Sequence, residues 1–167
     1  MGMTAILGMF AGIYHWFPKM YGKAMNKRMG MVHFWITIIC GYGVFLPMHF
    51  LGEGGLPRRY YENTNFPMFD HFLDLNILIS IFASVGVIAQ VIFFFNFFYS
   101  IFRGPRSSQN PWNSNSLEWT TPVEHVHGNW IGEIPIVHRW PYDYSKPGKE
   151  NDFVPQNVPL DDNEEEH

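Results

Sequence analysis

Residues 29–52 read MGMVHFWITIICGYGVFLPMHFLG and contain no charged side chain. A second uncharged run, LNILISIFASVGVIAQVIFFFNFFYSIF, occupies residues 75–102. Each run exceeds the roughly 20 residues that a helix needs to cross the hydrocarbon core of a bilayer. The two runs therefore predict membrane-spanning helices over residues 29–51 and 72–102, and an all-α membrane protein as the fold class.

The apolar stretch that opens the chain is shorter. It ends before Lys19, and its length to residue 17 gives only about 26 Å of helix. We interpret residues 1–18 as a transmembrane helix that lacks its first turn or two, and we expect the chain to be truncated at its N-terminus. Gly8 and Gly12 form a GxxxG pair within it, which favours close contact with another helix.

Charge divides the chain at about residue 102. Residues 1–102 hold six Lys/Arg and four Asp/Glu, whereas residues 103–167 hold five Lys/Arg and eleven Asp/Glu. The second part is also rich in proline, so we expect an irregular polar tail. No basic stripe suited to nucleic acid is present, and the single cysteine, Cys40, excludes an internal disulfide.

Basic residues in the loops predict the orientation. The loop at residues 19–28 holds four Lys/Arg and no acid, and the tail opens with Arg103 and Arg106. Because Lys and Arg stay preferentially on the cytoplasmic side, we place the 19–28 loop and the 103–167 tail in the cytoplasm. The Gly- and Pro-rich loop at residues 52–71 then faces outward.

Arg58 and Arg59 lie in that outward loop, close to the end of a spanning helix. The planar guanidinium group offers a fork of donors that suits carboxylates and phosphates. One interpretation is therefore recognition of an anionic group at the membrane boundary. The alternative is an ordinary pair of solvated or lipid-facing arginines.

Several histidines are candidates for chemistry. His33 and His49 lie near opposite ends of the second predicted span, about 24 Å apart along a helix, so they cannot share one metal. Each is a candidate for a proton relay or a cofactor ligand, or simply a hydrogen-bonding partner for a neighbouring helix. His125 and His127 alternate in the tail, but nothing nearby completes a metal site.

Six short motifs lie within the first 119 residues: HWFP at 15–18, HF at 33–34, PMHFLG at 47–52, GLPRRY at 55–60, PW at 111–112 and LEW at 117–119. Together they resemble subunit I of the haem–copper oxidases. They occur in the family's order and spacing, and they resemble the end of the tenth helix, the eleventh helix with its following loop, and the segment after the twelfth. The cytochrome c oxidase branch fits best, with quinol oxidases as an alternative.

The resemblance implies a C-terminal fragment of a twelve-helix bundle that holds two haems and copper. Arg58 and Arg59 match residues that bind the haem propionates, and His33 matches a histidine of debated role in proton movement. Val44 and Met48 depart from the Thr and Gln that the family often has on that route. The family's iron and copper ligands match no residue of this chain, so no metal ligand is assigned.

The resemblance also implies a function and partners. The complete subunit would reduce oxygen to water with electrons from cytochrome c and translocate protons, and this chain alone would be inactive. Its partners would be the N-terminal part of subunit I, subunits II and III, and the lipid bilayer, with the bacterial inner membrane as the location. The alternative is a non-catalytic accessory or assembly protein derived from this subunit. A small transporter is disfavoured by the lack of acidic or polar residues at mid-membrane.

Overall fold

The computed structural model describes residues 2–57, 59, 67–122, 130, 132–142 and 154–159. Within these residues the chain forms helices and no β-strand, so the predicted all-α fold is confirmed for them; an isolated backbone bridge joins Lys23 and Arg106. The elements are α1 (Gly2–Tyr21), α2 (Lys27–Glu53), the 3-10 helix η2 (Pro67–Phe72), α3 (Leu73–Arg103) and the 3-10 helix η3 (Leu117–Trp119).

Two helical segments are long and apolar enough to cross a membrane, Lys27–Glu53 and Pro67–Arg103. Only 11% of the residues in the apolar window of each are buried in the structure. A core helix of a soluble domain would be covered on most sides, whereas these two present apolar side chains all round. The structure therefore supports their interpretation as lipid-embedded helices.

Helix α1 does not meet the same criterion of length and hydropathy, so a truncated span over residues 1–18 stays a prediction. The expected close contact at its GxxxG pair is absent from the described residues. A Cβ atom added to Gly8 would meet nothing within 4 Å, and one added to Gly12 would meet only Trp16 of the same helix.

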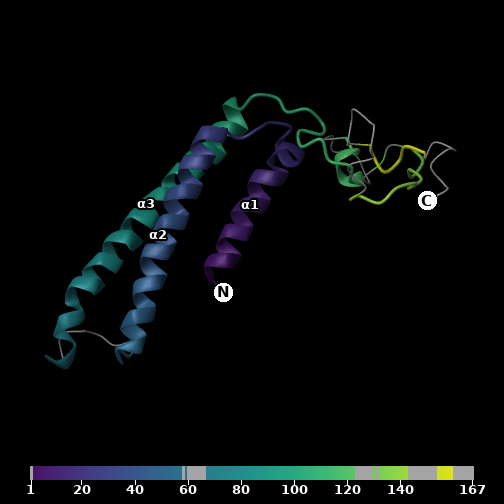
Figure 1. Cartoon of the computed structure of the whole chain (residues 1–167). Helices are drawn as coiled ribbons and strands as arrows, with labels where there is room; N and C mark the ends of the chain where they lie inside the picture. Colours follow the sequence, from purple (N-terminus) through teal and green to yellow (C-terminus); the bar gives the residue numbers. More distant parts are fainter. Residues whose placement is uncertain are drawn as a thin grey trace, which may run out of the picture. The chain divides into compact units, whose positions relative to one another are not determined.

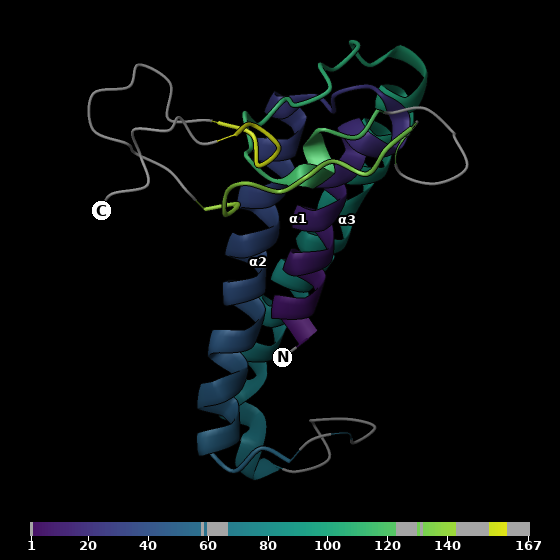
Figure 2. The same cartoon turned by 90° about the vertical axis from the view of Figure 1, so that its right-hand side faces the viewer.

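The chain divides into two compact units. The first comprises Met1–Met9 and Met25–Phe102, and the second comprises Phe10–Ala24 and Arg103–His167. In the first unit α2 and α3 run side by side, as both views of the chain show (Figure 1; Figure 2).

A polar contact fixes the start of α2 against α3. The side-chain oxygen of Asn26 accepts hydrogen bonds from the backbone N–H groups of Arg28 and Met29, which caps the helix. The fully buried amide of Asn96 then binds the Asn26 backbone twice, accepting from its N–H and donating to its C=O, both at 3.1 Å. Ser100 donates a further hydrogen bond to Asn96, so this buried polar group is satisfied.

Glycines allow the two long helices to approach closely. A Cβ atom added to Gly43 of α2 would lie 2.5 Å from the Phe82 ring of α3, and one added to Gly86 would lie 3.3 Å from the Cβ of Cys40. Both distances are shorter than ordinary carbon–carbon contact. The absence of a side chain at these two positions therefore sets the separation of α2 and α3.

The second unit joins the end of α1 to the start of the tail. The Lys19 ammonium group donates hydrogen bonds to the backbone oxygen and the hydroxyl of Thr121 and to the backbone oxygen of Glu118. The His15 ring stacks on Trp112 with ring centroids 5.5 Å apart, and the Trp112 indole N–H donates to the His15 carbonyl oxygen at 3.1 Å. The tail is thus attached to the last turns of α1.

Candidate functional site

The first unit contains a cavity of about 730 Å³ at the C-terminal end of α2. Its volume falls in the range of small-molecule and cofactor sites. The walls are mostly apolar, and α3 contributes one side of them. The lining residues are Phe45, Met48, His49, Leu51, Gly52, Glu53, Leu56, Pro57, Arg59, Asn76 and Ile79.

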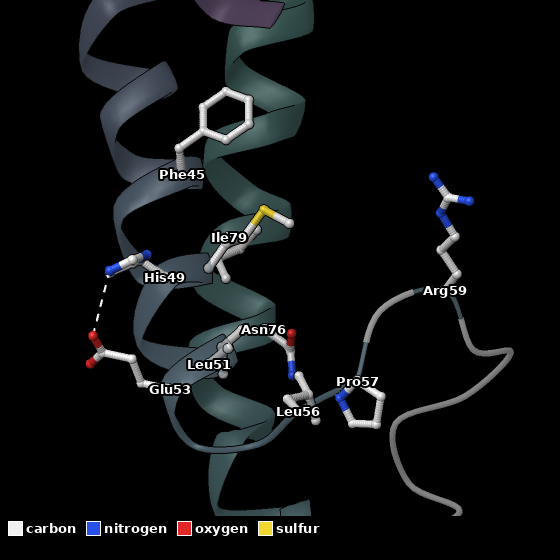
Figure 3. Close-up of a pocket in the computed structure, with 11 residues that line it drawn as sticks. Phe45, His49, Leu51, Glu53, Leu56, Pro57, Arg59, Asn76 and Ile79 are labelled. Atoms are coloured by element: carbon white, nitrogen blue, oxygen red, sulfur yellow. Dashed lines mark ion pairs between the residues drawn. The ribbon is translucent and has the colours of Figure 1, made fainter. Parts of the chain in front are cut away.

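Arg59 is the arginine of the predicted pair that the structure describes, and it lies at this cavity. Figure 3 shows it on the loop beyond Pro57, set apart from the two helices and with its guanidinium pointing upward in this view. Its side chain is exposed and makes no hydrogen bond or ion pair with any described residue. Arg58, the other member of the pair, lies outside the described residues.

The backbone of Arg59 adopts a left-handed conformation, with φ at 67°. Such a conformation costs a non-glycine residue roughly 1–3 kcal/mol, and residues that retain it are concentrated at functional sites. An exposed cation that has no partner among the described residues and lies on a strained backbone is therefore the strongest sign of function in this cavity.

His49 and Glu53 are the other ionisable residues of the cavity lining, and they contact each other. Their side chains lie one helical turn apart on α2, with His49 Nε2 3.5 Å from Glu53 Oε1 (Figure 3). Both side chains are largely exposed, at 73% and 66%, so solvent screens the pair when the histidine is protonated. Neither group is paired with Arg59, so no described residue of the cavity lining neutralises its guanidinium.

His33 lies elsewhere, about 30 Å along α2 from the cavity end of the helix. It is buried, and its Nε2 lies 3.1 Å from the side-chain oxygen of Gln90 on α3. The amide of Gln90 in turn donates to Thr37 Oγ1 at 3.2 Å and to the Gly86 carbonyl at 2.9 Å. The structure thus gives His33 a hydrogen bond to a neighbouring helix and does not bring it together with Arg59.

Gln90 and Asn96 correct one expectation from the sequence. We expected no polar residues at mid-membrane, yet Gln90 lies near the centre of α3 and Asn96 is fully buried against the start of α2. The sequence did contain a signal for such contacts, because an amide side chain within a long apolar run is costly unless it has a hydrogen-bonding partner. Only the partners, His33 and the Asn26 backbone, required the structure.

No metal site is formed by the described residues. No group of three or more His, Cys, Asp or Glu side chains among them could hold a metal ion. His125 and His127 lie outside the described residues. His138 is described, and its backbone N–H donates to the Gln156 carbonyl at 2.9 Å.

Comparison with known proteins identifies relatives of this chain. The family model described as "Cytochrome C and Quinol oxidase polypeptide I" matches residues 1–85. The chain is 45% identical over 163 residues to the alternative cytochrome c oxidase subunit 1 of Bradyrhizobium diazoefficiens, covering 95% of this chain and 27% of that protein. It is 40% identical to cytochrome c oxidase subunit 1 of Thermostichus vulcanus, covering 84% of this chain and 24% of that protein. The chain thus spans about a quarter of the length of these relatives.

Proposed function

Because the chain belongs to the cytochrome c and quinol oxidase polypeptide I family, we propose that it is the C-terminal part of the catalytic subunit of a respiratory terminal oxidase. The resemblance seen in the short motifs and the all-α membrane fold are both confirmed by this membership together with the two apolar helices. The proposed activity of the complete subunit is reduction of oxygen to water with electrons from cytochrome c, coupled to proton translocation. The family match is the observation that carries this proposal.

Within that subunit, the role proposed for this chain is to hold haem propionates with Arg58 and Arg59. The described part of the cavity suits an amphipathic ligand of this kind. Its walls offer apolar surface from residues such as Phe45 and Ile79, and Arg59 offers a carboxylate a guanidinium that no described residue pairs with. Planar bidentate donors are the groups that bind carboxylates most strongly. When bound, the haems and copper would supply the electron transfer and the oxygen chemistry.

His33 is proposed to act in helix packing, with a proton route as the alternative. Its bond to Gln90 joins α2 to α3 inside the apolar region, where a lost partner is not replaced by water. The side chains of Val44 and Met48 make no polar contact with the described residues. They therefore do not extend the His33–Gln90 hydrogen bonds toward the cavity end of α2.

The proposed partners are the remaining part of subunit I, subunits II and III, and cytochrome c. The proposed location is a bacterial inner membrane, which agrees with the bacterial origin of the relatives. In the proposed orientation the cavity and Arg59 face outward, and the tail that begins at Arg103 is cytoplasmic.

The test is to isolate the complex that contains this chain from its native membranes and to compare Arg59→Gln with the unchanged protein. A charge-assisted hydrogen bond contributes about 1.5–3 kcal/mol, so its loss should weaken haem retention by roughly ten- to a hundredfold. We expect an altered haem absorption spectrum and slower electron transfer from reduced cytochrome c. Arg28→Gln, at the opposite end of α2, is the matched control and should leave both unchanged.

Two outcomes would contradict the proposal. Identical haem spectra and electron-transfer rates in Arg59→Gln and the control would exclude a propionate contact. Isolation of the unchanged chain in a complex without haem would instead favour the non-catalytic accessory protein.

A further inference from the structure

The second unit buries polar side chains, and it exposes apolar side chains along residues 132–142. Gln156 and Arg139 are buried. In contrast, the side chains that we call the apolar face of the tail are between 51% and 81% exposed. The apolar face consists of Ile134, Ile136, Val137, Trp140 and Tyr142.

Hydrogen bonds of the buried polar groups hold this arrangement in place. The Gln156 amide donates to the Arg139 carbonyl at 3.0 Å, and the His138 N–H donates to the Gln156 carbonyl at 2.9 Å. The Arg139 guanidinium donates to the Val158 carbonyl at 3.3 Å. Turning the apolar face inward would leave these buried donors and acceptors without partners, which is costly. The side chains of the apolar face are therefore held on the outside of this unit, and the Trp140 and Tyr142 rings contact each other there with centroids 5.6 Å apart. Exposed apolar groups that gather in this way often mark a contact with a partner or a membrane.

The same unit contains the point where α3 ends. Arg103, the last residue of the apolar helix α3, opens the part of the tail that belongs to this unit. Backbone bonds join Ala24 to Pro105 at 2.9 Å, and Gln156 binds Asn115 at 3.1 Å. The apolar face is thus connected, through contacts within one compact unit, to the residues at which a membrane-spanning helix leaves the bilayer.

We propose that the apolar face of the tail lies against the lipid bilayer, at the boundary between headgroups and acyl chains. Trp and Tyr rings favour this level because one edge is apolar and the other can bind water or headgroups. Ile134 and Ile136 add apolar surface to the two rings. Arg103 and Arg106, exposed in the same unit, match the negative charge of anionic lipid headgroups.

The backbone of the tail limits the depth of this contact. Residues 134–137 form neither helix nor strand, so their amide groups would lack partners in the hydrocarbon core. The contact is therefore interfacial. It requires only that α3 spans a bilayer, and it stands independently of the proposed haem contacts.

Spin labelling tests the proposal on the full chain with its partners, extracted from native membranes in discs of native lipid. Single variants Ile136→Cys and Trp140→Cys carry a nitroxide, and Glu133→Cys, an exposed polar position of the same segment, is the matched control. Label on the unchanged chain, whose single Cys40 is buried, measures the background. Collisions with oxygen, which concentrates in lipid, are compared with collisions with a water-soluble nickel chelate.

We expect the oxygen-to-nickel accessibility ratio to be several-fold higher at positions 136 and 140 than at position 133. Ratios equal to that of the control would show that the apolar face is in water and would overturn the proposal. Low accessibility to both reagents, with an immobilised spectrum, would show coverage by protein and would overturn it equally. Agreement between the two labelled positions guards against a local effect of removing the Trp140 ring.

Discussion

The contact between Gly43 and Phe82 offers a sharp test of how α2 and α3 pack. In Gly43→Ala, the new Cβ atom would lie 2.5, 2.6 and 2.7 Å from Cγ, Cδ1 and Cδ2 of the Phe82 ring. Favourable carbon–carbon contact begins near 3.5 Å, so the shortfall is roughly 1 Å. Cγ is the ring atom attached to the Phe82 Cβ, so rotation of the ring about its own axis does not relieve the clash. Either Phe82 must change its χ1 rotamer or the two helices must separate.

The size of the effect follows from two opposing contributions. Overpacking of this kind costs about 1–3 kcal/mol. Replacing Gly by Ala in a helix returns up to about 1 kcal/mol through helix propensity. Pro47 reduces the cost somewhat, because it donates no hydrogen bond to the Gly43 carbonyl and leaves this turn of α2 more deformable. We expect a net destabilisation of about 1–2 kcal/mol.

Gly8→Ala is the matched control, because Gly8 is a helical glycine outside the cavity lining and an added Cβ atom there meets nothing within 4 Å. It should be neutral or slightly stabilising. The assay is thermal unfolding of the chain in its native-membrane complex, in lipid discs. Gly43→Ala should unfold a few degrees below the unchanged protein, and Gly8→Ala at or above it. Equal unfolding temperatures for the two variants would refute the reasoning, because they would mean that α2 and α3 do not approach at Gly43.

Two further predictions concern polar contacts. The first is a double-mutant cycle of His33→Leu and Gln90→Leu, measured by unfolding. We expect a favourable coupling energy of roughly 0.6 kcal/mol, the average for polar pairs between membrane helices. Additive effects of the two substitutions would show that the pair does not interact. Burial lowers the pKa of Lys19 below its ordinary value of 10.5, with the nearby Glu118 opposing the shift. The unfolded chain therefore binds more protons between the lowered pKa and 10.5, so stability should rise with pH through that window. In Lys19→Met, this rise of stability with pH should be absent when the free energy of unfolding is measured across the same window. A variant whose stability changes with pH as the unchanged protein's does would contradict the prediction.

The sequence by itself determined the membrane helices and the family. Uncharged runs longer than a bilayer is thick have no other common explanation, because each charge in the hydrocarbon core is costly. The bounds of α2 and α3 follow from the charges that end those runs. The paired arginines and the short motifs around His33 and Pro47 also indicated the family, and they do so without any tertiary contact. All of these signals are local, and each can be read without knowing what a residue contacts.

The tertiary structure decided which residues meet. The GxxxG pair of α1 indicated a helix contact, but in the described chain side chains of α1 and α3 approach glycines of α2 instead, Met3 at Gly41 and Phe82 at Gly43. The facing side chain, and not the spacing of glycines, decides where these helices fit. The partners of His33 and Asn96 lie 57 and 70 residues away in sequence. The inverted burial of the tail, with Arg139 inside and Trp140 outside, depends on hydrogen bonds from Gln156 that no pattern within residues 132–142 could reveal. Such pairings arise from long-range packing, which hydrophobic periodicity and charge do not encode.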